Sequence, residues 1–313
     1  MMGAYIASFT AFVVVNAHHI PLNIPGIVYW LLPTAIFMPL ILFWSRKVEA
    51  GQKVQLMEIA IICLVAFGAS VLTFFSGFGL GTLLTPVFAI FFPVELAIAL
   101  TGVVHFCNNL FKLFLVGKHA DRDVVFRFGV PAVIAAFIGS LLLVNISDLP
   151  ALFTYTFNGN EVSVYPVKFI VAVLLIIFAL IDIIPYFGKL AFEKNWLPIG
   201  GAMSGFFGGL SGVQGALRSA FLIKAGLSKE AFLGTAVVVS TFVDFTRLGV
   251  YANRFSTAGL SSNLTLVILA TLSAITGAYL GNKLLKKVTL RTIQLMVAVL
   301  LIVISLALGS GLI

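Results

Sequence analysis

Apolar runs of membrane-spanning length recur from one end of the chain to the other. A transmembrane helix needs about 20 mostly apolar residues, and most charged residues lie between such runs rather than inside them. Two runs, 80–92 and 216–226, are too short to span and follow glycine-rich stretches, so we expect half-helices of the re-entrant type there. The full set of predicted helices covers residues 4–17, 26–44, 56–76, 80–92, 94–116, 126–147, 166–187, 197–213, 216–226, 230–251, 262–282 and 292–312.

The composition supports an all-α, polytopic membrane protein. Of the 313 residues, 61% are hydrophobic and 10% are charged, and the mean hydropathy is +1.14. Ordinary soluble domains are about 45–50% apolar and about 25% charged, so the soluble classes are excluded. We expect a multi-pass protein of the cell membrane, a bacterial inner membrane, surrounded by the lipid bilayer. The net charge of +8 falls mostly in loops beside spans, so it indicates topology and no nucleic-acid partner.

Lysines and arginines are concentrated in four loops between predicted spans. Because such residues mark cytoplasmic loops, we place these four inside and segment 148–165 outside. Segment 56–93 then crosses the membrane once, whereas segment 197–228 returns to the side on which it began. Charge counting leaves open which of these two hairpins is re-entrant. The four loops are 45–55, 117–127, 188–196 and 283–291.

Two glycine-rich breaks interrupt the apolar pattern. They are residues 76–82 (SGFGLGT) and residues 208–219 (GGLSGVQGALRS). Paired glycine-broken segments in the two halves of a membrane protein indicate the binding site of a transporter. When the sequence is aligned with itself so that Gly77 matches Gly209, the first break aligns with the second, and Lys112 aligns with Asp244. We therefore predict an internal duplication.

The duplication divides the chain into three parts. The first repeat of the transporter core covers residues 56–187 and the second covers residues 197–313. By the charge rule, matched spans run in opposite directions, so the repeats are inverted. Residues 1–50 hold two extra N-terminal transmembrane helices that have no counterpart in the repeat.

Arg218 follows the second break directly and is the most distinctive charged residue. If residues 216–226 form a half-helix, Arg218 lies in its first turn, where free backbone N–H groups and the helix dipole favour an anion. Its planar guanidinium group can donate two hydrogen bonds to an oxyanion. The alternative is a structural salt bridge with Asp244, and the two roles are compatible.

Two predicted spans carry polar stripes at helical spacing. Ser240, Asp244 and Arg247 share one face of span 230–251. Span 94–116 carries a similar stripe, and ionisable groups inside a span face the protein interior. An Asp–Arg pair within one helix is often only structural; the functional alternative is gating or proton coupling. The residues to which we assign that role are His105, Lys112, Asp244 and Arg247.

The remaining polar groups at or opposite the breaks are candidates for binding a substrate. The usual motifs of hydrolases, nucleotide-binding proteins and metal sites do not occur, so we expect no catalytic residue, no metal and no cofactor. The substrate-binding candidates are Gln214, Arg218, Ser219, Ser211, Gly212, Gly79, Gly81, Thr82, Asn108, Asn109 and Ser240.

The stretches around the breaks also form a family pattern. Residues 76–86 (SGFGLGTLLTP) and 205–221 (GFFGGLSGVQGALRSAF), followed by Asp244 and Arg247, resemble the TauE/SafE family of sulfite and organosulfur-anion exporters over roughly residues 56–310. The second stretch is the more specific. The chain departs from the usual pattern in its sparser glycines and its extra N-terminal spans. The resemblance implies secondary transport, as an exporter, of a small sulfur-containing anion such as sulfite or a sulfonate.

The residues alone support only a small oxyanion, and they leave other classes open. An anion channel would share these features, and flux saturation and coupling to pH would separate it from a transporter. A membrane-embedded enzyme would need a nucleophile or metal that we do not find. The sequence does not decide which anion is carried, in which direction, or with which coupling ion. It also leaves the oligomeric state open, and a homo-oligomer is one possibility.

Overall fold

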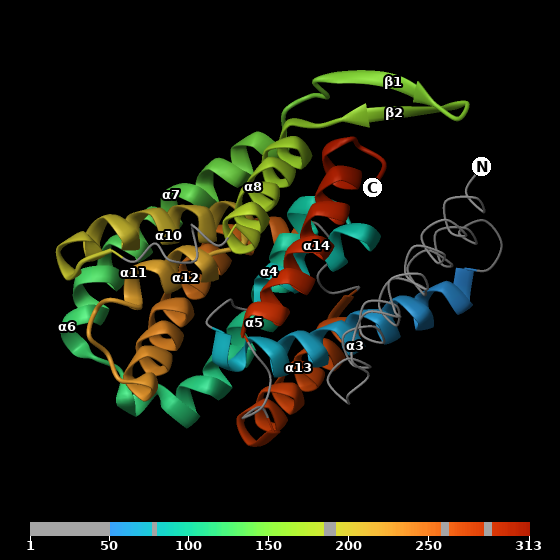
Figure 1. The fold of residues 1–313 in the computed structure, drawn as a ribbon. Coiled ribbons are helices and arrows are strands. Elements are labelled where there is room, and N and C mark those ends of the chain that lie inside the picture. The colour runs from blue at the N-terminus through green and yellow to red at the C-terminus, as the bar shows by residue number, and fades with distance from the viewer. Residues whose placement is uncertain (1–50, 77–79, 185–191, 258–262, 285–289) are drawn as a thin grey trace, which may run out of the picture. The chain divides into compact units, whose positions relative to one another are not determined.

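The computed structural model describes residues 51–313 apart from 77–79, 185–191, 258–262 and 285–289 (Figure 1). The two predicted N-terminal helices and Gly79 lie outside the described residues. Within the described part, helices predominate, and five are long and apolar enough to cross a membrane. These five candidate spans are Leu56–Thr73, Val94–His119, Arg122–Ser147, Lys229–Ala252 and Leu264–Gly281.

The predicted helices that fall within the described residues are present, and most boundaries differ by a few residues. The predicted helix 94–116 is matched by α5, because Pro93 precedes its first turn and Gly117 follows its last. The short segments after the breaks form short helices, α4 and α11. The described helices are α3 (Gly51–Ser76), α4 (Leu80–Phe91), α5 (Val94–Val116), α6 (Arg122–Val124), α7 (Val130–Ser147), α8 (Pro166–Ile183), α10 (Leu197–Ser211), α11 (Gly215–Leu222), α12 (Lys229–Thr257), α13 (Leu264–Leu284) and α14 (Leu290–Gly309).

One element contradicts the all-α prediction. Strand β1 (Phe153–Phe157) pairs antiparallel with β2 (Asn160–Val164) in the segment that was predicted to be an exterior loop. Asn158 and Gly159 connect them with φ values of 51° and 82°, which suits the tight hairpin turns in which Asn-Gly is favoured. Tyr155 then donates a hydrogen bond of 2.7 Å to the Ser310 carbonyl, which fixes the hairpin to the end of α14.

The span before this hairpin is also less regular than predicted. A π-helical turn, Val125–Gly129, lies between α6 and α7 within the candidate span Arg122–Ser147. Pro131 follows it and has no N–H to donate, so regular α-helical bonding is interrupted at this point. The wider turn places the backbone of Phe128 against Gly201 of α10.

Glycines spaced by four hold α7 and α10 together. A side chain at Gly201, Gly205 or Gly209 would collide with the backbone of α7 or the turn before it. The facing backbone belongs to Phe128, Ala132 and Ala136, which have the same spacing. Small residues at this interval let two membrane helices approach until their backbones touch.

A related contact joins α13 to α3. A side chain on Gly277 would collide with the Phe67 carbonyl, much as one on Gly139 of α7 would collide with the Phe206 carbonyl of α10. The other packing pairs place α12 against α5 and α7, α13 against α5, α4 against α5, and α14 against α8. Helix α12 is therefore surrounded by neighbours, and its polar stripe is buried.

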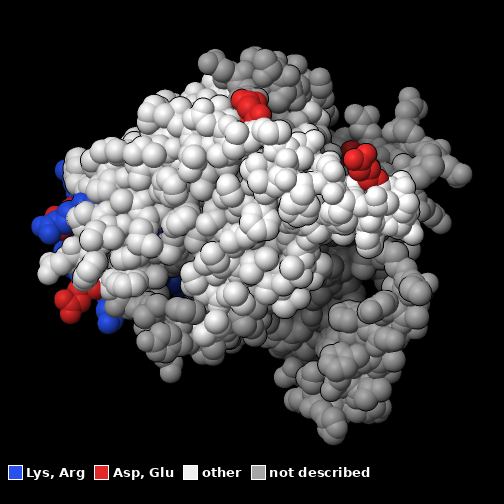
Figure 2. All heavy atoms as spheres, turned by 90° about the horizontal axis from the view of Figure 1, so that it is seen from above, with Lys and Arg blue, Asp and Glu red and all other residues white. Residues whose placement is uncertain are grey.

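Exposed charges gather at one end of the described helices. In Figure 2, the basic residues of the visible face lie at one edge together with some acidic residues. Most of the remaining described surface on this face carries no charged residue. At the charged end, Asp123 accepts from Arg127 at 2.8 Å and from Lys194 at 3.3 Å. Two of the loops that we predicted to be cytoplasmic therefore lie side by side.

Candidate functional site

The second break is a real interruption between two helices. Helix α10 ends at Ser211, and Gly212 takes the left-handed conformation (φ 77°) while its N–H donates to the Gly208 carbonyl at 3.0 Å. A residue with a Cβ is strained in this conformation, which explains the glycine. Helix α11 begins at Gly215, with Gln214 as the residue before it.

The two breaks meet in the structure although they are far apart in the sequence. A Cβ on Gly81, at the start of α4, would lie 2.7 Å from the carbonyl oxygen of Gly212. Gly212 in turn lies next to Arg247 of α12 and Thr85 of α4. Any side chain at either glycine would separate the two segments or strain them. The predicted candidates Gly81 and Gly212 are therefore in contact.

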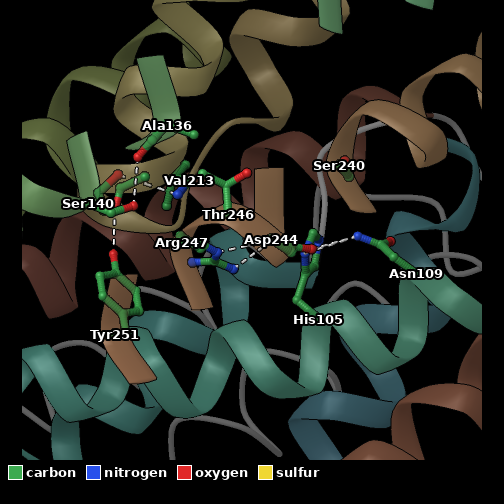
Figure 3. A network of polar contacts seen from close by, with 12 residues as sticks. His105, Asn109, Ala136, Ser140, Val213, Ser240, Asp244, Thr246, Arg247 and Tyr251 are labelled. Atoms are coloured by element: carbon green, nitrogen blue, oxygen red, sulfur yellow. Dashed lines mark hydrogen bonds and ion pairs between the residues drawn. The ribbon is translucent and has the colours of Figure 1, made fainter. Parts of the chain in front are cut away.

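Asp244 is the centre of a buried polar network that joins α5 and α12 (Figure 3). Its Oδ2 lies 2.6 Å from Nδ1 of His105 and accepts from Nδ2 of Asn109 at 2.9 Å. Its Oδ1 accepts from Nε of Arg247 at 3.0 Å, and Nη2 of the same arginine lies at 2.9 Å. Asp244 and Arg247 are 0% exposed and His105 is 3% exposed.

The chemistry of this network fixes the direction of its hydrogen bonds. An ionised carboxylate can only accept, so Nδ1 of His105 must carry the proton that it shares with Asp244. Asn109 lies 3.1 Å from the same Nδ1 and directs its amide to the carboxylate. Both oxygens of Asp244 are thus supplied with donors, as a buried carboxylate requires.

Arg218 lies on the other side of the second break and is 3% exposed. It is in the first turn of α11, and its backbone N–H makes the first intrahelical bond, 3.1 Å to the Gln214 carbonyl. Its side chain donates through Nη1 to the hydroxyl of Ser240 on α12. The ion pairs of Asp244 are with His105 and Arg247, so the structural salt bridge between Arg218 and Asp244 stays a prediction.

The other predicted residues that the structure describes are buried apart from the half-buried Ser219, and they form two overlapping groups. Ser211 has a structural part, because it donates to the Phe207 carbonyl at 2.9 Å and accepts from the Val213 N–H at 3.3 Å. Asn108 accepts at 3.4 Å from Ser70 of α3. The second group keeps a buried polar atom without a hydrogen-bond partner among the described residues: Nδ2 of Asn108, Oε1 of Gln214 and Oγ of Ser219. Thr82 is buried on α4.

The comparison with known families decides the class of protein. The model of the family "Sulfite exporter TauE/SafE" matches residues 62–308, which include both breaks and the Asp244 network. The chain belongs to the TauE/SafE family. Comparison with curated proteins and with solved structures found no match. As a TauE/SafE protein it is a membrane transporter of the sulfite-exporter type, so the resemblance seen in the sequence is confirmed.

Some buried polar residues of this TauE/SafE protein were not among the site residues predicted from the sequence. Thr101 of α5 precedes His105 by one turn and Tyr251 of α12 follows Arg247 by one turn, so both extend stripes that were already recognised. Tyr251 donates to the Gly209 carbonyl of α10. Ser70 lies on α3, which carried no polar stripe, and nothing in the sequence singled it out.

Proposed function

We propose that the protein is a secondary transporter that exports a small sulfur-containing anion, such as sulfite or a sulfonate. Membership of the TauE/SafE family supports the transporter class. The observation that carries the choice of an anion is the charge of the buried residues. We place the protein in the inner membrane of a bacterium, where the negative interior favours the outward movement of an anion.

Buried positive charge exceeds buried negative charge in the described part of the chain. Lys112, Arg218 and Arg247 are 6%, 3% and 0% exposed, whereas Asp244 is the one buried carboxylate there. Buried charges are costly unless an opposite charge balances them. This excess of buried positive charge would attract a bound anion and repel a bound cation.

The second break supplies donors as well as charge. The first backbone N–H groups of α11 precede the intrahelical bond of Arg218, so they have no acceptor within the helix and can bind an anion. Gln214 and Ser219 lie at the same turn. This supports an oxyanion held by Arg218, by backbone N–H groups and by polar side chains of α5 and α12.

The contacts between helices support a core made of two halves. Gly139 packs on Phe206 and Gly277 packs on Phe67, so the third helix of each proposed repeat contacts the first helix of the other. The two breaks meet in the same reciprocal way, at Gly81 and Gly212. We propose inverted repeats, 56–187 and 197–313, with gating at the two glycine breaks around the anion.

The Asp244 network is our candidate for gating or proton coupling. His105 is the side chain whose ordinary pKa lies nearest to neutral pH, and it shares a proton with Asp244 at 2.6 Å. Arg247 and Lys112 lie close enough to interact with the charge of this pair, so a change in its protonation would change their electrostatic environment. The pair can therefore link the binding of an anion to a proton without any further group.

The test is binding and flux with purified protein. Sulfite, methanesulfonate, taurine, sulfoacetate and sulfate are compared by thermal shift in detergent, and sulfite flux is measured in proteoliposomes. We expect a sulfur oxyanion to stabilise the protein, saturable flux, and a loss of about 100-fold in affinity for Arg218→Ala, since a charged hydrogen-bonded partner is removed. Arg127→Ala, which removes an exposed arginine, is the matched control.

Three results would contradict the proposal. Normal binding and flux by Arg218→Ala would remove Arg218 from the site. Sulfite flux that rises linearly with sulfite concentration and does not depend on pH would favour the anion channel instead. Conversion of any of these anions into another compound by the protein in detergent would favour an enzyme.

A further inference from the structure

Arg247 contacts Asp244 with only one edge of its guanidinium group. Nε and Nη2 lie at 3.0 and 2.9 Å from Oδ1 of Asp244. Nη1 has no hydrogen-bond partner among the described residues, and the side chain is completely buried. A guanidinium group is always charged and has five N–H donors. A buried charged donor without an acceptor is unfavourable, so this edge is arranged for an acceptor that binds from outside the chain.

Nη1 faces the place where the two breaks meet. A Cβ on Gly212 would lie 2.8 Å from Nη1 and 3.2 Å from Oγ1 of Thr85, and the next atom, Cγ2 of Ile98, would be 3.8 Å away. Thr85 belongs to α4, is 1% exposed, and its hydroxyl has no partner within the described part of the chain. Because Gly212 has no side chain, Nη1 of Arg247 and the hydroxyl of Thr85 both lie beside its backbone.

Among the described residues, the hydroxyl of Thr85 does not make the bond that a helical threonine commonly makes within its own helix. A threonine in a helix commonly donates to the carbonyl four residues earlier, as Thr241, Thr246 and Thr276 do. Neither Thr85 nor Thr101 makes such a bond in the described structure. The methyl group of Thr101 lies 3.8 Å from where a Cβ on Gly81 would be, so Thr101 also borders the contact between the breaks.

We propose that Nη1 of Arg247 and the hydroxyls of Thr85 and Thr101 form an oxyanion subsite at this contact. The inference rests on the proposed function and adds a second binding position to it. Ser240, the partner of Arg218, lies two helical turns before Arg247, about 10 Å along α12. Sulfite or a sulfonate group has several acceptor oxygens, so it can satisfy the guanidinium edge and both hydroxyls together.

The test uses variants that remove one hydroxyl and little else. Sulfite and methanesulfonate binding is measured by thermal shift and calorimetry on the full-length protein in detergent. We expect Thr85→Val to weaken binding about tenfold, the value of one hydrogen bond to a charged group. Adding Thr101→Val should weaken binding further. The melting temperature without anion should not fall, because no hydrogen bond within the chain is lost.

The matched control is Thr271→Val on α13, which removes another buried hydroxyl without a partner among the described residues. Wild-type affinity in Thr85→Val and in the double variant, with Arg218→Ala impaired, would overturn the subsite and leave the proposed function intact. An equal loss of binding in Thr271→Val would also overturn the subsite. If the wild-type protein neither binds nor moves these anions, the proposed function itself fails.

Discussion

Two interfaces between helices in this protein are built in opposite ways. At the α7–α10 interface, Gly201, Gly205 and Gly209 bring two backbones into contact. At the α5–α12 interface, His105 and Asp244 form the centre of a buried polar network (Figure 3). The first depends on shape and the second on charge.

The difference indicates which part of the protein can change state. An interface of touching backbones has one favourable arrangement, because a small shift causes collisions. A network of hydrogen bonds and charges can be rearranged when a proton or an anion is added. The α7–α10 pair is therefore expected to move as a rigid unit, whereas the α5–α12 contact is expected to respond to the ligand.

The largest effect is expected where shape alone holds the helices. Gly205→Val would place a branched side chain inside the backbone of Ala132. Overpacking typically costs about 1–3 kcal/mol, but the facing backbone cannot move aside here. We therefore expect a loss in free energy of unfolding of more than about 5 kcal/mol, the whole stability of a marginally stable protein. The measurement is equilibrium unfolding in mixed micelles, or the yield of folded protein.

Gly249→Ala on α12 is the control for this change. A Cβ on Gly249 would meet nothing within 4 Å, so the variant should be as stable as the wild-type protein or up to about 1 kcal/mol more stable. Wild-type stability in Gly205→Val would show that the α7–α10 interface can adapt, and the distinction between the two interfaces would disappear.

The second largest effect is expected at the charged interface. Asp244→Asn removes the carboxylate and leaves Arg247 as a buried charge without compensation. Breaking a buried ion pair in this way costs about 3–5 kcal/mol, measured as a loss in free energy of unfolding. Replacing both residues, Asp244→Asn with Arg247→Gln, should restore much of the stability.

Asp123→Asn is the control for the charge change. Asp123 also accepts from an arginine, at 2.8 Å, but on the exposed surface. Water screens such a pair, so the melting temperature should not change. If Asp244→Asn were as mild as this control, the Asp244 network would not stabilise the α5–α12 interface.

The sequence predicts the helices of this protein better than their contacts. A mostly apolar run between Pro93 and Gly117 is enough to define α5. The β1–β2 hairpin was missed, although Asn158-Gly159 is a strong turn signal, because the surrounding pattern favoured an exterior loop. A short local motif is easily overlooked between two long membrane spans.

The residues of the Asp244 network could be predicted from the sequence, but their pairings could not. The polar stripes contain His105, Asn109, Asp244 and Arg247, since polar groups in a span must face inward. The repeat placed Lys112 at the position equivalent to Asp244, but the carboxylate contacts His105 and Asn109. Equivalent positions in a repeat need not touch. Which atoms meet depends on the rotation of each helix, which is determined by its packing.

A smaller effect is expected from His105→Gln. Glutamine can still donate a hydrogen bond to Asp244, so the loss in free energy of unfolding should be about 1 kcal/mol. Glutamine cannot bind a proton, however. If His105 couples transport to protons, sulfite flux should lose its dependence on pH between about 5.5 and 7.5, the range in which histidine usually titrates. A pH profile equal to that of the wild-type protein would exclude His105 as the proton carrier.

A small loss in free energy of unfolding, with no expected change in pH dependence, is predicted at Tyr251, which connects the two interfaces. Because α10 is broken, the Val213 N–H donates to Ser211 rather than to the Gly209 carbonyl. That carbonyl accepts from Tyr251 of α12. The hydroxyl of Ser140 on α7 donates to the Ala136 carbonyl at 2.6 Å and lies 3.4 Å from the Gly209 carbonyl, so it is a weaker second donor. Tyr251→Phe should therefore cost about 0.5–1.5 kcal/mol in free energy of unfolding.

A double-mutant cycle shows whether this bond couples the rigid interface to the charged one. If Tyr251 and Ser140 share the Gly209 carbonyl, removing either leaves the other to satisfy it. The combined loss in Tyr251→Phe with Ser140→Ala should then exceed the sum of the single losses by about 0.5 kcal/mol or more. Simple additivity would mean that the carbonyl has another donor, and that the two interfaces are not joined through Gly209.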